Sequence, residues 1–349
     1  MRDVIDDIAG IGAGSDLDAL RALRPDVRAA TAGSEDAIFA GPSGLSPGER
    51  HAVAAHVARL HDDPRLQARH AALADTTSPR LPVLYPFAEL LTLHTDQASP
   101  AAIRALTEAG LAPRDIVMLA QLVAYVAYVS RMGVALDLLA GRDGAGGTAV
   151  PLHPRSPGTA DFGFTADSLD WEAWAPILDI AQATPEQLAI LDASHASARI
   201  SPYYLLLVQE PAVLRERSKL FNTIMYGPRG ASRAEREFAS VIESRINGCP
   251  YCASVHAQRW AQLKGDPALM ARILAEGVEV EMPPRLRAIA DFAARLSATP
   301  PAAAASDVAH LRAQGMNDAE ILDIAAAVAM FAWANRLMQT LGEPRRKPA

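Results

Sequence analysis

The chain has 349 residues, half of them hydrophobic, and carries a formal net charge of −7. This length suits two domains with ample apolar material to bury. Aromatic residues make up only 5% and alanine is abundant, which favours helices packed closely through small side chains. The one basic block, Arg345-Arg346-Lys347, is too short for a nucleic-acid-binding face. We therefore expect neither a nucleic acid nor an anionic membrane as a partner.

The location of the protein is predicted from three features of the sequence. The first residues, 1–7, are acidic and lack the apolar segment of a signal peptide. The apolar stretches at 116–129 and 321–334 are shorter than the ~20 residues of a membrane span, and we expect both to be buried core helices. The two cysteines lie three positions apart, unlike those of a secreted disulfide scaffold. Together these features predict a cytoplasmic protein.

The chain contains an internal repeat. Residues 25–50 match residues 211–236 at a constant offset of 186, and the matched positions include glycines and prolines. A second block, 106–110, matches 311–315 at an offset of 205. The change of offset predicts an insertion in the second copy, between residues 265 and 305. Two collinear blocks favour a duplicated domain over chance similarity between alanine-rich helices.

The duplication predicts an all-α protein with two tandem helical domains. We expect a first domain at 1–145, a linker rich in Gly, Pro and Ser at 146–164, and a second domain at 165–349. Helix starts are predicted at Ser46 and Ser232, where a glutamate three residues later completes a capping box. No run of alternating apolar residues predicts a β-strand.

Two helices are expected to meet at the cysteines. The helix that begins at Ser232 should end near Ile246, where Asn247-Gly248 supplies a turn. Cys249 then begins the next helix, and Pro250 occupies its first turn, where a missing N–H costs nothing.

Cys249, Cys252 and His256 have the spacing i, i+3, i+7, which places them on one helical face. Cys252 lies in the first turn, where the helix dipole favours a thiolate. His256, one turn on, can exchange a proton with Cys252, and Cys249 can form a disulfide with it. A thiolate, a proton donor and a second thiol are the parts that peroxide reduction needs.

A carboxylate that orients the histidine would complete this set. Glu237 lies roughly 15 Å back along its helix from the turn, and His256 lies about 11 Å along the next helix, at ~1.5 Å per residue. In an antiparallel helix pair the two side chains can therefore face each other. Glu243 and Glu235 are competitors that spacing alone does not exclude.

The combination of Glu237, Asn247–Cys252 and His256 resembles the Glu…Cys-x-x-Cys-x-x-x-His signature of the alkylhydroperoxidase D / carboxymuconolactone decarboxylase superfamily. The resemblance extends over residues ~165–345. It is strongest in 209–264 and returns at 331–336, and its combined spacing is far more specific than a bare Cys-x-x-Cys. The superfamily fold is all-α, and its members form trimers or hexamers of the domain. The resemblance thus implies a homo-oligomer, with a trimer of this duplicated chain favoured.

The resemblance also implies an activity, the thiol-dependent reduction of alkyl hydroperoxides. In it, Cys252 attacks the hydroperoxide, Cys249 resolves the product, and His256 and Glu237 relay protons. No cofactor or metal is implied, and turnover requires an external dithiol, such as a thioredoxin or a lipoyl-type donor.

The first half resembles a degenerate copy of the same domain. At the offset of 186, the positions of the glutamate, the two cysteines and the histidine hold His51, Asp63, Leu66 and His70. Because this half lacks the cysteines, we expect it to replace a partner subunit rather than to act on a substrate.

Other interpretations stay open. Zinc would need ligands besides the cysteine pair and His256, since structural zinc sites usually have four. A decarboxylase- or lactone-type enzyme could use His256 and Glu237 as acid and base without cysteines, and a redox sensor would use the cysteines without turnover. Tyr251 and Trp260 can line a substrate pocket or belong to the core, while Asn335-Arg336 is expected to brace the site helix.

Overall fold

The computed structural model describes residues 2–142, 162–228 and 230–347, and this part of the chain is mostly helical. The expected all-α fold is therefore confirmed. The helices of the first half are α1 (Val4–Ile8), α2 (Asp16–Ala22), α3 (Pro25–Phe39), α4 (Pro47–Leu60), α5 (Pro64–Ala71), α6 (Leu81–Leu93), α7 (Pro100–Glu108) and α8 (Pro113–Leu139). Those of the second half are α9 (Pro185–Ser194), α10 (Pro202–Leu207), α11 (Pro211–Tyr226), α12 (Arg233–Ile246), α13 (Pro250–Gln262), α14 (Pro267–Glu276), α15 (Pro284–Ser297), α16 (Ala305–Ala313) and α17 (Asp318–Thr340).

Local capping chemistry sets several helix starts. The hydroxyls of Ser46 and Ser232 accept hydrogen bonds from the backbone N–H three residues on, and the glutamate there accepts from the serine N–H in return. Thr184 and Asn317 begin α9 and α17 in the same way. These bonds satisfy backbone donors that have no partner within the helix, so the capping boxes predicted from the sequence are confirmed.

Replacing Ser232 with alanine is expected to lower the free energy of unfolding by about 1 kcal/mol, because the first turn of α12 loses its side-chain acceptor. Ser46→Ala should cost a similar amount at the start of α4. Ser306→Ala, at an exposed position within α16, is a control with an expected change within about 0.5 kcal/mol. Urea denaturation followed by circular dichroism measures all three, and equal stability of the variants would contradict the capping role.

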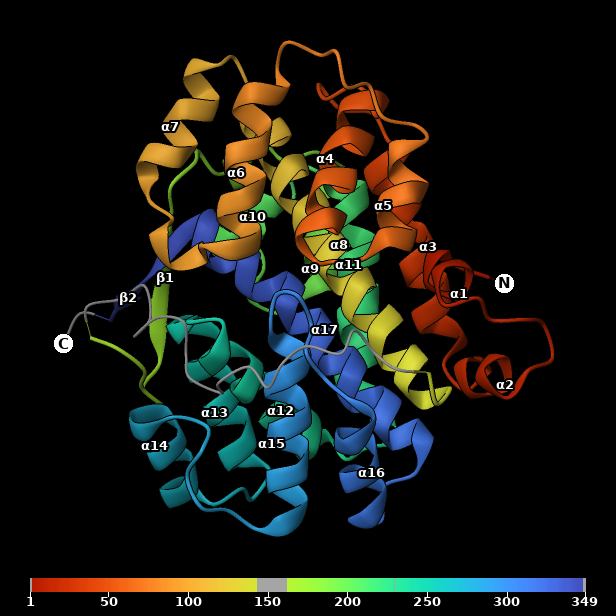
Figure 1. The fold of residues 1–349 in the computed structure, drawn as a ribbon. Coiled ribbons are helices and arrows are strands. Elements are labelled where there is room, and N and C mark those ends of the chain that lie inside the picture. The colour runs from red at the N-terminus through yellow and green to blue at the C-terminus, as the bar shows by residue number, and fades with distance from the viewer. Residues whose placement is uncertain (1, 143–161, 229, 348–349) are drawn as a thin grey trace.

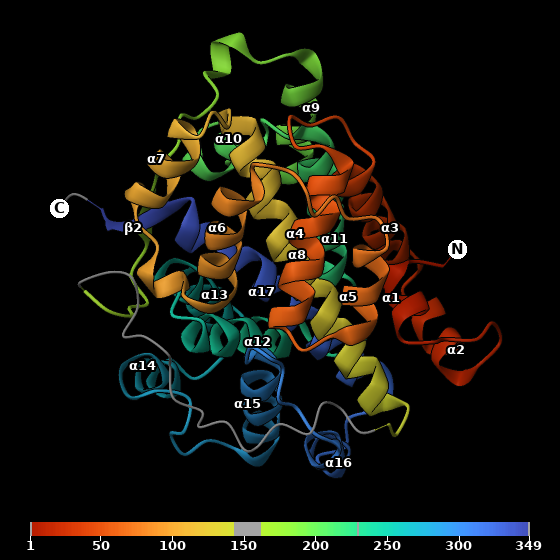
Figure 2. The same ribbon diagram turned by 45° about the horizontal axis from the view of Figure 1, so that its top comes forward.

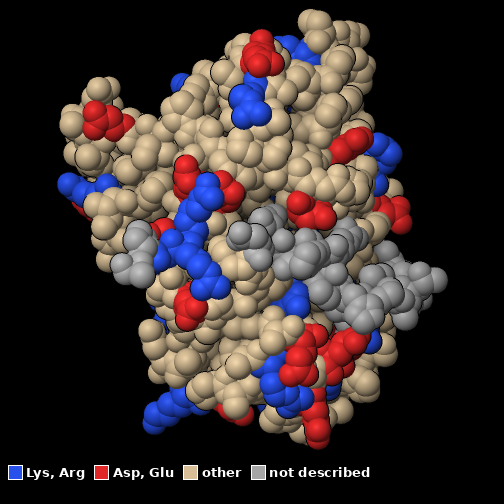
Figure 3. Space-filling view, turned by 90° about the vertical axis from the view of Figure 1, so that its left-hand side faces the viewer, with Lys and Arg blue, Asp and Glu red and all other residues tan. Residues whose placement is uncertain are grey.

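A small β-sheet was not expected from the sequence. Strands β1 (Leu169–Ala173) and β2 (Gly342–Arg346) pair antiparallel. Strand β1 alternates buried and exposed residues over most of its length, a short pattern that the sequence analysis missed. The sheet is anchored by a tertiary contact: the Trp171 indole donates to the carbonyl of Met338, 2.9 Å away. Arg345 lies in β2 and pairs with Glu172 across the sheet at 2.8 Å. On the face of the molecule that contains these strands, basic and acidic side chains are interspersed (Figure 3).

The order of helices repeats along the chain. Helix α4 packs on α5, α6 and α8, and α12 makes the corresponding contacts with α13, α15 and α17. Helix α14 has no counterpart between α5 and α6, and it lies within the stretch where the insertion was predicted. The structure therefore shows the same helical arrangement twice, with one added helix in the second copy.

The two halves share one continuous hydrophobic core. Equivalent helices meet at its centre, α8 against α17 and α3 against α11 (Figures 1 and 2). Polar links cross the same contact: Trp333 donates to Gln121 at 2.8 Å, and Arg24 pairs with Asp323 at 2.7 Å. Most of the predicted linker 146–164 lies outside the described residues, and the domain boundaries stay a prediction.

Helices α8 and α17 are long and apolar enough, by length and composition, to cross a membrane. They extend beyond the apolar stretches noted in the sequence. Their most apolar segments are 94% and 100% buried inside the protein, as in the central helices of a globular fold. The prediction that both are buried core helices is confirmed.

Candidate active site

The turn between α12 and α13 places the cysteine pair. Helix α12 ends at Ile246, Asn247 caps it, and Gly248 has a φ of 77°. Glycine takes this left-handed conformation without the strain that a Cβ would add. Cys249 is the N-cap of α13 and Pro250 its first residue, as the sequence predicted.

Both cysteines are free thiols and both are buried, with Cys249 1% and Cys252 5% exposed. A side-chain hydrogen bond between them, together with burial, raises the pKa of Cys252 well above that of an ordinary thiol. The helix dipole favours a thiolate at Cys252, whereas the hydrogen bond with Cys249 and burial favour the neutral thiol. Burial penalises the charged form of a thiol, and the neighbouring sulfur of Cys249 adds to this effect.

Glu237 lies directly against His256. Its Oε2 is 2.5 Å from Nδ1 of the imidazole, and its side chain is fully buried. Arg233 contacts the other carboxylate oxygen at 3.3 Å. Burial raises the pKa of Glu237, but the hydrogen bond from His256 and the nearby positive charges outweigh burial, so this pKa lies below its usual value. Glu237 is thus an anion that accepts from Nδ1–H and leaves Nε2 free for proton transfer.

The competing glutamates lie elsewhere. Glu235 closes the capping box of α12 and pairs with Arg285 at 2.6 Å. Glu243 accepts from the Asn247 side chain at 2.6 Å. Burial raises the pKa of Glu243 to about 7, although the charges of two arginines lower it. Of the three candidates in the sequence, only Glu237 contacts His256 in the part of the chain described.

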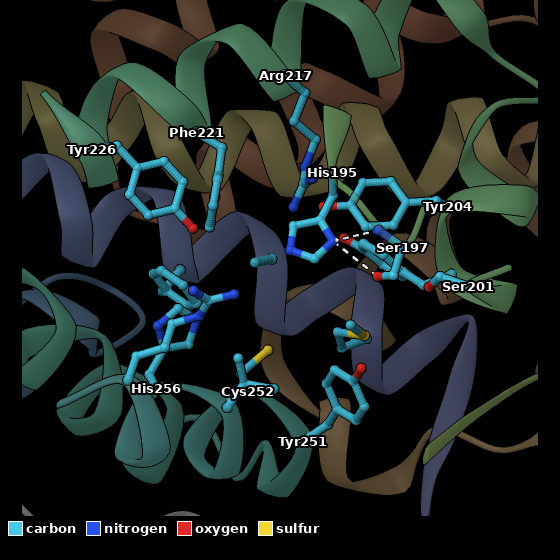
Figure 4. A pocket seen from close by; sticks show the side chains of 16 residues that line it. His195, Ser197, Ser201, Tyr204, Arg217, Phe221, Tyr226, Tyr251, Cys252 and His256 are labelled. Atoms are coloured by element: carbon cyan, nitrogen blue, oxygen red, sulfur yellow. Dashed lines mark hydrogen bonds between the residues drawn. The ribbon is translucent and has the colours of Figure 1, made fainter. Parts of the chain in front are cut away.

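Cys252 and His256 open on a cavity of about 230 Å³. Figure 4 shows both side chains reaching it from α13. Cys249 and Glu237 lie behind them and do not line it. The residues that line the cavity are His195, Ser197, Ser201, Tyr203, Tyr204, Arg217, Phe221, Tyr226, Tyr251, Cys252, Val255, His256, Arg259, Phe331, Ala334 and Met338.

Aromatic residues near the cysteines divide between cavity and core. Tyr251 lines the cavity, whereas Trp260 packs on Phe238 with ring centroids 5.6 Å apart. Trp260 is therefore a core residue and not a pocket residue. Phe331 contacts the His256 ring edge-on at 4.3 Å between centroids, which together with Glu237 holds the imidazole in place.

The sequence did not identify Arg217, which reaches the cavity from α11 (Figure 4). A signal was present in the repeat, because the position 186 residues earlier is Thr31. Other charged residues of α11, such as Arg215 and Lys219, also face uncharged residues at this offset, so the sequence alone does not single out Arg217. Its fixed place at the cavity depends on how α11 packs, which spacing does not reveal.

The Asn335-Arg336 pair braces the helices around the site, as expected. The Asn335 side chain accepts a hydrogen bond from the Ser244 hydroxyl at 3.2 Å. Arg336 donates to the Thr299 hydroxyl at 3.1 Å, and its counterpart Arg131 donates to the same oxygen at the same distance. The two arginines thus join the halves at a single buried threonine.

The first half keeps the geometry of the site but not its chemistry. His51 and His70 lie 3.0 Å apart through their Nδ1 atoms, where the second half has Glu237 and His256. Phe39 stacks on both rings. Burial is the main cause that lowers the pKa of His70 to about 3, and it also lowers the pKa of His51. At the equivalent positions this half has no cysteine, and a histidine, His51, replaces Glu237.

No family model matches the chain, and no curated protein matches it. One solved structure similar to it is the alkylhydroperoxidase AhpD core, a peroxidase-related protein of Ralstonia eutropha JMP134. The two chains are 26% identical, with 48% of this chain and 88% of the other covered, at a TM-score of 0.43. Another is a peroxidase-related protein of Silicibacter sp. TM1040, 24% identical over 57% of this chain and 96% of the other, at a TM-score of 0.40. The solved structures similar to this chain thus include an AhpD-core protein and a peroxidase-related protein.

Proposed function

We propose that this protein reduces organic hydroperoxides with Cys252 as the attacking thiol. The observation that carries the proposal is the shared cavity of Cys252 and His256, with Cys249 hydrogen-bonded to the first and Glu237 to the second. A nucleophile, a base, a group that orients the base and a second thiol are thus together in one place.

The first step is proton transfer from Cys252 to Nε2 of His256. Because the pKa of Cys252 is raised, the thiolate forms during the reaction and not at rest. The anionic Glu237 stabilises the imidazolium that results, as a buried carboxylate does for a catalytic histidine. The ion pair between the imidazolium of His256 and the carboxylate of Glu237 thus offsets the free-energy cost of ionising the buried thiol.

The thiolate then attacks one oxygen of the O–O bond. An S–O bond forms, the O–O bond breaks, and the alkoxide leaves with the proton from His256, so that the products are a sulfenic acid and an alcohol. Cys249 attacks the sulfur of Cys252, its thiol proton goes to the departing hydroxide, and a disulfide and water result. The peroxide is reduced by the two electrons that the thiol pair loses.

A dithiol donor must return those electrons. Cys252 lines the cavity, whereas Cys249 is 1% exposed and lies outside it. The donor, a thioredoxin or a lipoyl-type dithiol, therefore attacks Cys252 through the cavity and releases Cys249 first. We also propose that the protein forms a homo-oligomer, with a trimer favoured, and light scattering tests that assembly.

A single-turnover experiment tests the proposed function. Reduced protein should consume an equimolar amount of cumene hydroperoxide and lose the mass of two hydrogens. Cys249→Ser should consume the same amount but stop at the sulfenic acid, which a dimedone-type reagent labels at position 252. If the parent protein forms no disulfide, or if the label in Cys249→Ser appears elsewhere, Cys252 is not the peroxide-reactive thiol.

A further inference from the structure

Arg217 is a buried cation that faces the site. It is 4% exposed, and its side chain points from α11 into the cavity, across from Cys252 (Figure 4). The guanidinium carbon lies 5.8 Å from the ring centroid of Tyr203 and 5.7 Å from that of Trp333. These two rings hold the guanidinium in a fixed position without neutralising its charge.

The charge of Arg217 has no anionic partner in the described part of the chain. Its Nε lacks a hydrogen-bond partner, and its guanidinium forms no ion pair with the described residues. Buried arginines are normally paired, because desolvation of an unpaired charge is costly. The five N–H donors of a guanidinium suit the two oxygens of a carboxylate.

The other residues that line the cavity also favour a negatively charged ligand. Arg259 lines it from α13 and adds a second positive charge. His195 lines it from the loop after α9, and burial lowers the pKa of its imidazole, which favours the neutral form. The residues that form its wall include no aspartate or glutamate. A cavity with basic groups and low-dielectric walls attracts an anion and concentrates the field on it.

The remaining wall is largely aromatic. Tyr204, Phe221, Tyr226, Tyr251 and Phe331 surround a volume of about 230 Å³. Such a wall suits the apolar body of a small organic molecule, while the few polar groups fix its orientation.

We infer that the substrate of this site is a small organic hydroperoxide that bears a carboxylate. The carboxylate binds Arg217, the apolar body contacts the aromatic wall, and the O–O bond reaches Cys252. The peroxide part of this inference rests on the proposed function, and the carboxylate part rests on Arg217 and the cavity alone.

The duplication supports a role for Arg217 in the site rather than in the fold. At the equivalent position of the first half, Thr31 forms a hydrogen bond with the Tyr128 hydroxyl at 3.1 Å. Tyr128 stands where the second half has Trp333, at the offset of 205. The same helix contact is therefore made without an arginine in the half that lacks the cysteines.

A second role for Arg217 can be separated by experiment. Its positive charge also lowers the pKa of Cys252, against the larger effects of Cys249 and burial. If activation of the sulfur were its only role, losing Arg217 would slow every hydroperoxide equally. A carboxylate-binding role predicts a loss confined to carboxylate substrates.

The test compares cumene hydroperoxide with its para-carboxylate, 4-(2-hydroperoxypropan-2-yl)benzoate. We expect the protein to prefer the carboxylate in kcat/KM by about tenfold or more, as for a well-placed charge-assisted pair. In Arg217→Gln the preference should fall to about one. Arg215→Gln removes the same charge from an exposed position of α11 and should keep the parental preference. Equal slowing of both substrates by Arg217→Gln would overturn the inference.

A binding measurement is independent of the peroxide chemistry. The protein with Cys249→Ser and Cys252→Ser is titrated by calorimetry with 4-isopropylbenzoate and with the neutral 4-isopropylbenzamide. We expect the carboxylate to bind about tenfold more tightly, and Arg217→Gln to remove this difference. Carboxylate binding without peroxide consumption by the parent would refute the proposed function and support the inference. If the parent consumes peroxide but shows no carboxylate preference, in rate or in binding, the inference is refuted and the proposed function is supported.

Discussion

Cys252→Ser is expected to slow hydroperoxide reduction by at least about 10³-fold, because a buried hydroxyl cannot supply the nucleophile that a thiol supplies. The substitution removes one sulfur and keeps the size and hydrogen-bonding capacity of the side chain. The rate of peroxide loss in the presence of a dithiol donor measures the effect.

Cys249→Ser is the matched control, because this residue lies behind Cys252 and does not line the cavity. It should still reduce one equivalent of peroxide in the first turnover and lose only the disulfide-dependent cycle. If Cys252→Ser consumes peroxide as fast as the parent, the proposed function is wrong. Activity that survives loss of both cysteines would point instead to acid–base chemistry by His256 and Glu237.

Glu237→Gln is expected to lower the rate by about 10²- to 10⁴-fold, the range that a positioned acid–base group contributes. An amide can hold the imidazole but cannot stabilise the imidazolium. Glu243→Gln is the matched control, since Glu243 is also a fully buried glutamate of α12 but lies outside the site. Because burial raises the pKa of Glu243 to about 7, a neutral amide at this position changes the local charge little at neutral pH. The rate of Glu243→Gln should therefore stay within about threefold of the parental rate.

The pH dependence separates loss of the proton relay from a loosened structure. Without the relay, Cys252 must lose its proton to solvent and not to His256. Because the pKa of Cys252 is raised, little thiolate is present at neutral pH. Below that pKa the thiolate fraction grows about tenfold per pH unit, so the residual rate of Glu237→Gln should rise steeply between about pH 7 and pH 9. The parent protein, which forms the thiolate through His256, should show a shallower rise. Parallel profiles for the two proteins would argue against a proton relay.

The placement of the cysteine pair was predictable because it depends on neighbours in the sequence. A capping box begins α12, a glycine with positive φ ends its turn, and Cys249 and Pro250 begin α13. Cys252 and His256 belong to the same helix, so their spacing alone puts them on one face. The helical fold was predictable for the same reason, since its start signals and apolar periodicity are local.

Features that depend on burial were not predictable. Spacing allowed three glutamates to face His256, and only the packing of α12 on α13 selected Glu237. The sequence placed Cys252 at a positive helix end, but burial and the neighbouring Cys249 raise its pKa instead of lowering it. Burial of a given atom is a property of everything packed around it, and one helix does not contain that information.

The sequence by itself determined that this protein is helical, that its arrangement is duplicated, and that one half carries a thiol pair with a histidine. The tertiary structure decided what that thiol pair faces. The cavity forms from α10, α11, α13, α17 and the loop after α9, and Arg217 enters it from α11. Segments distant in the chain meet there through core packing, so the positive charge of the cavity follows only from the folded molecule.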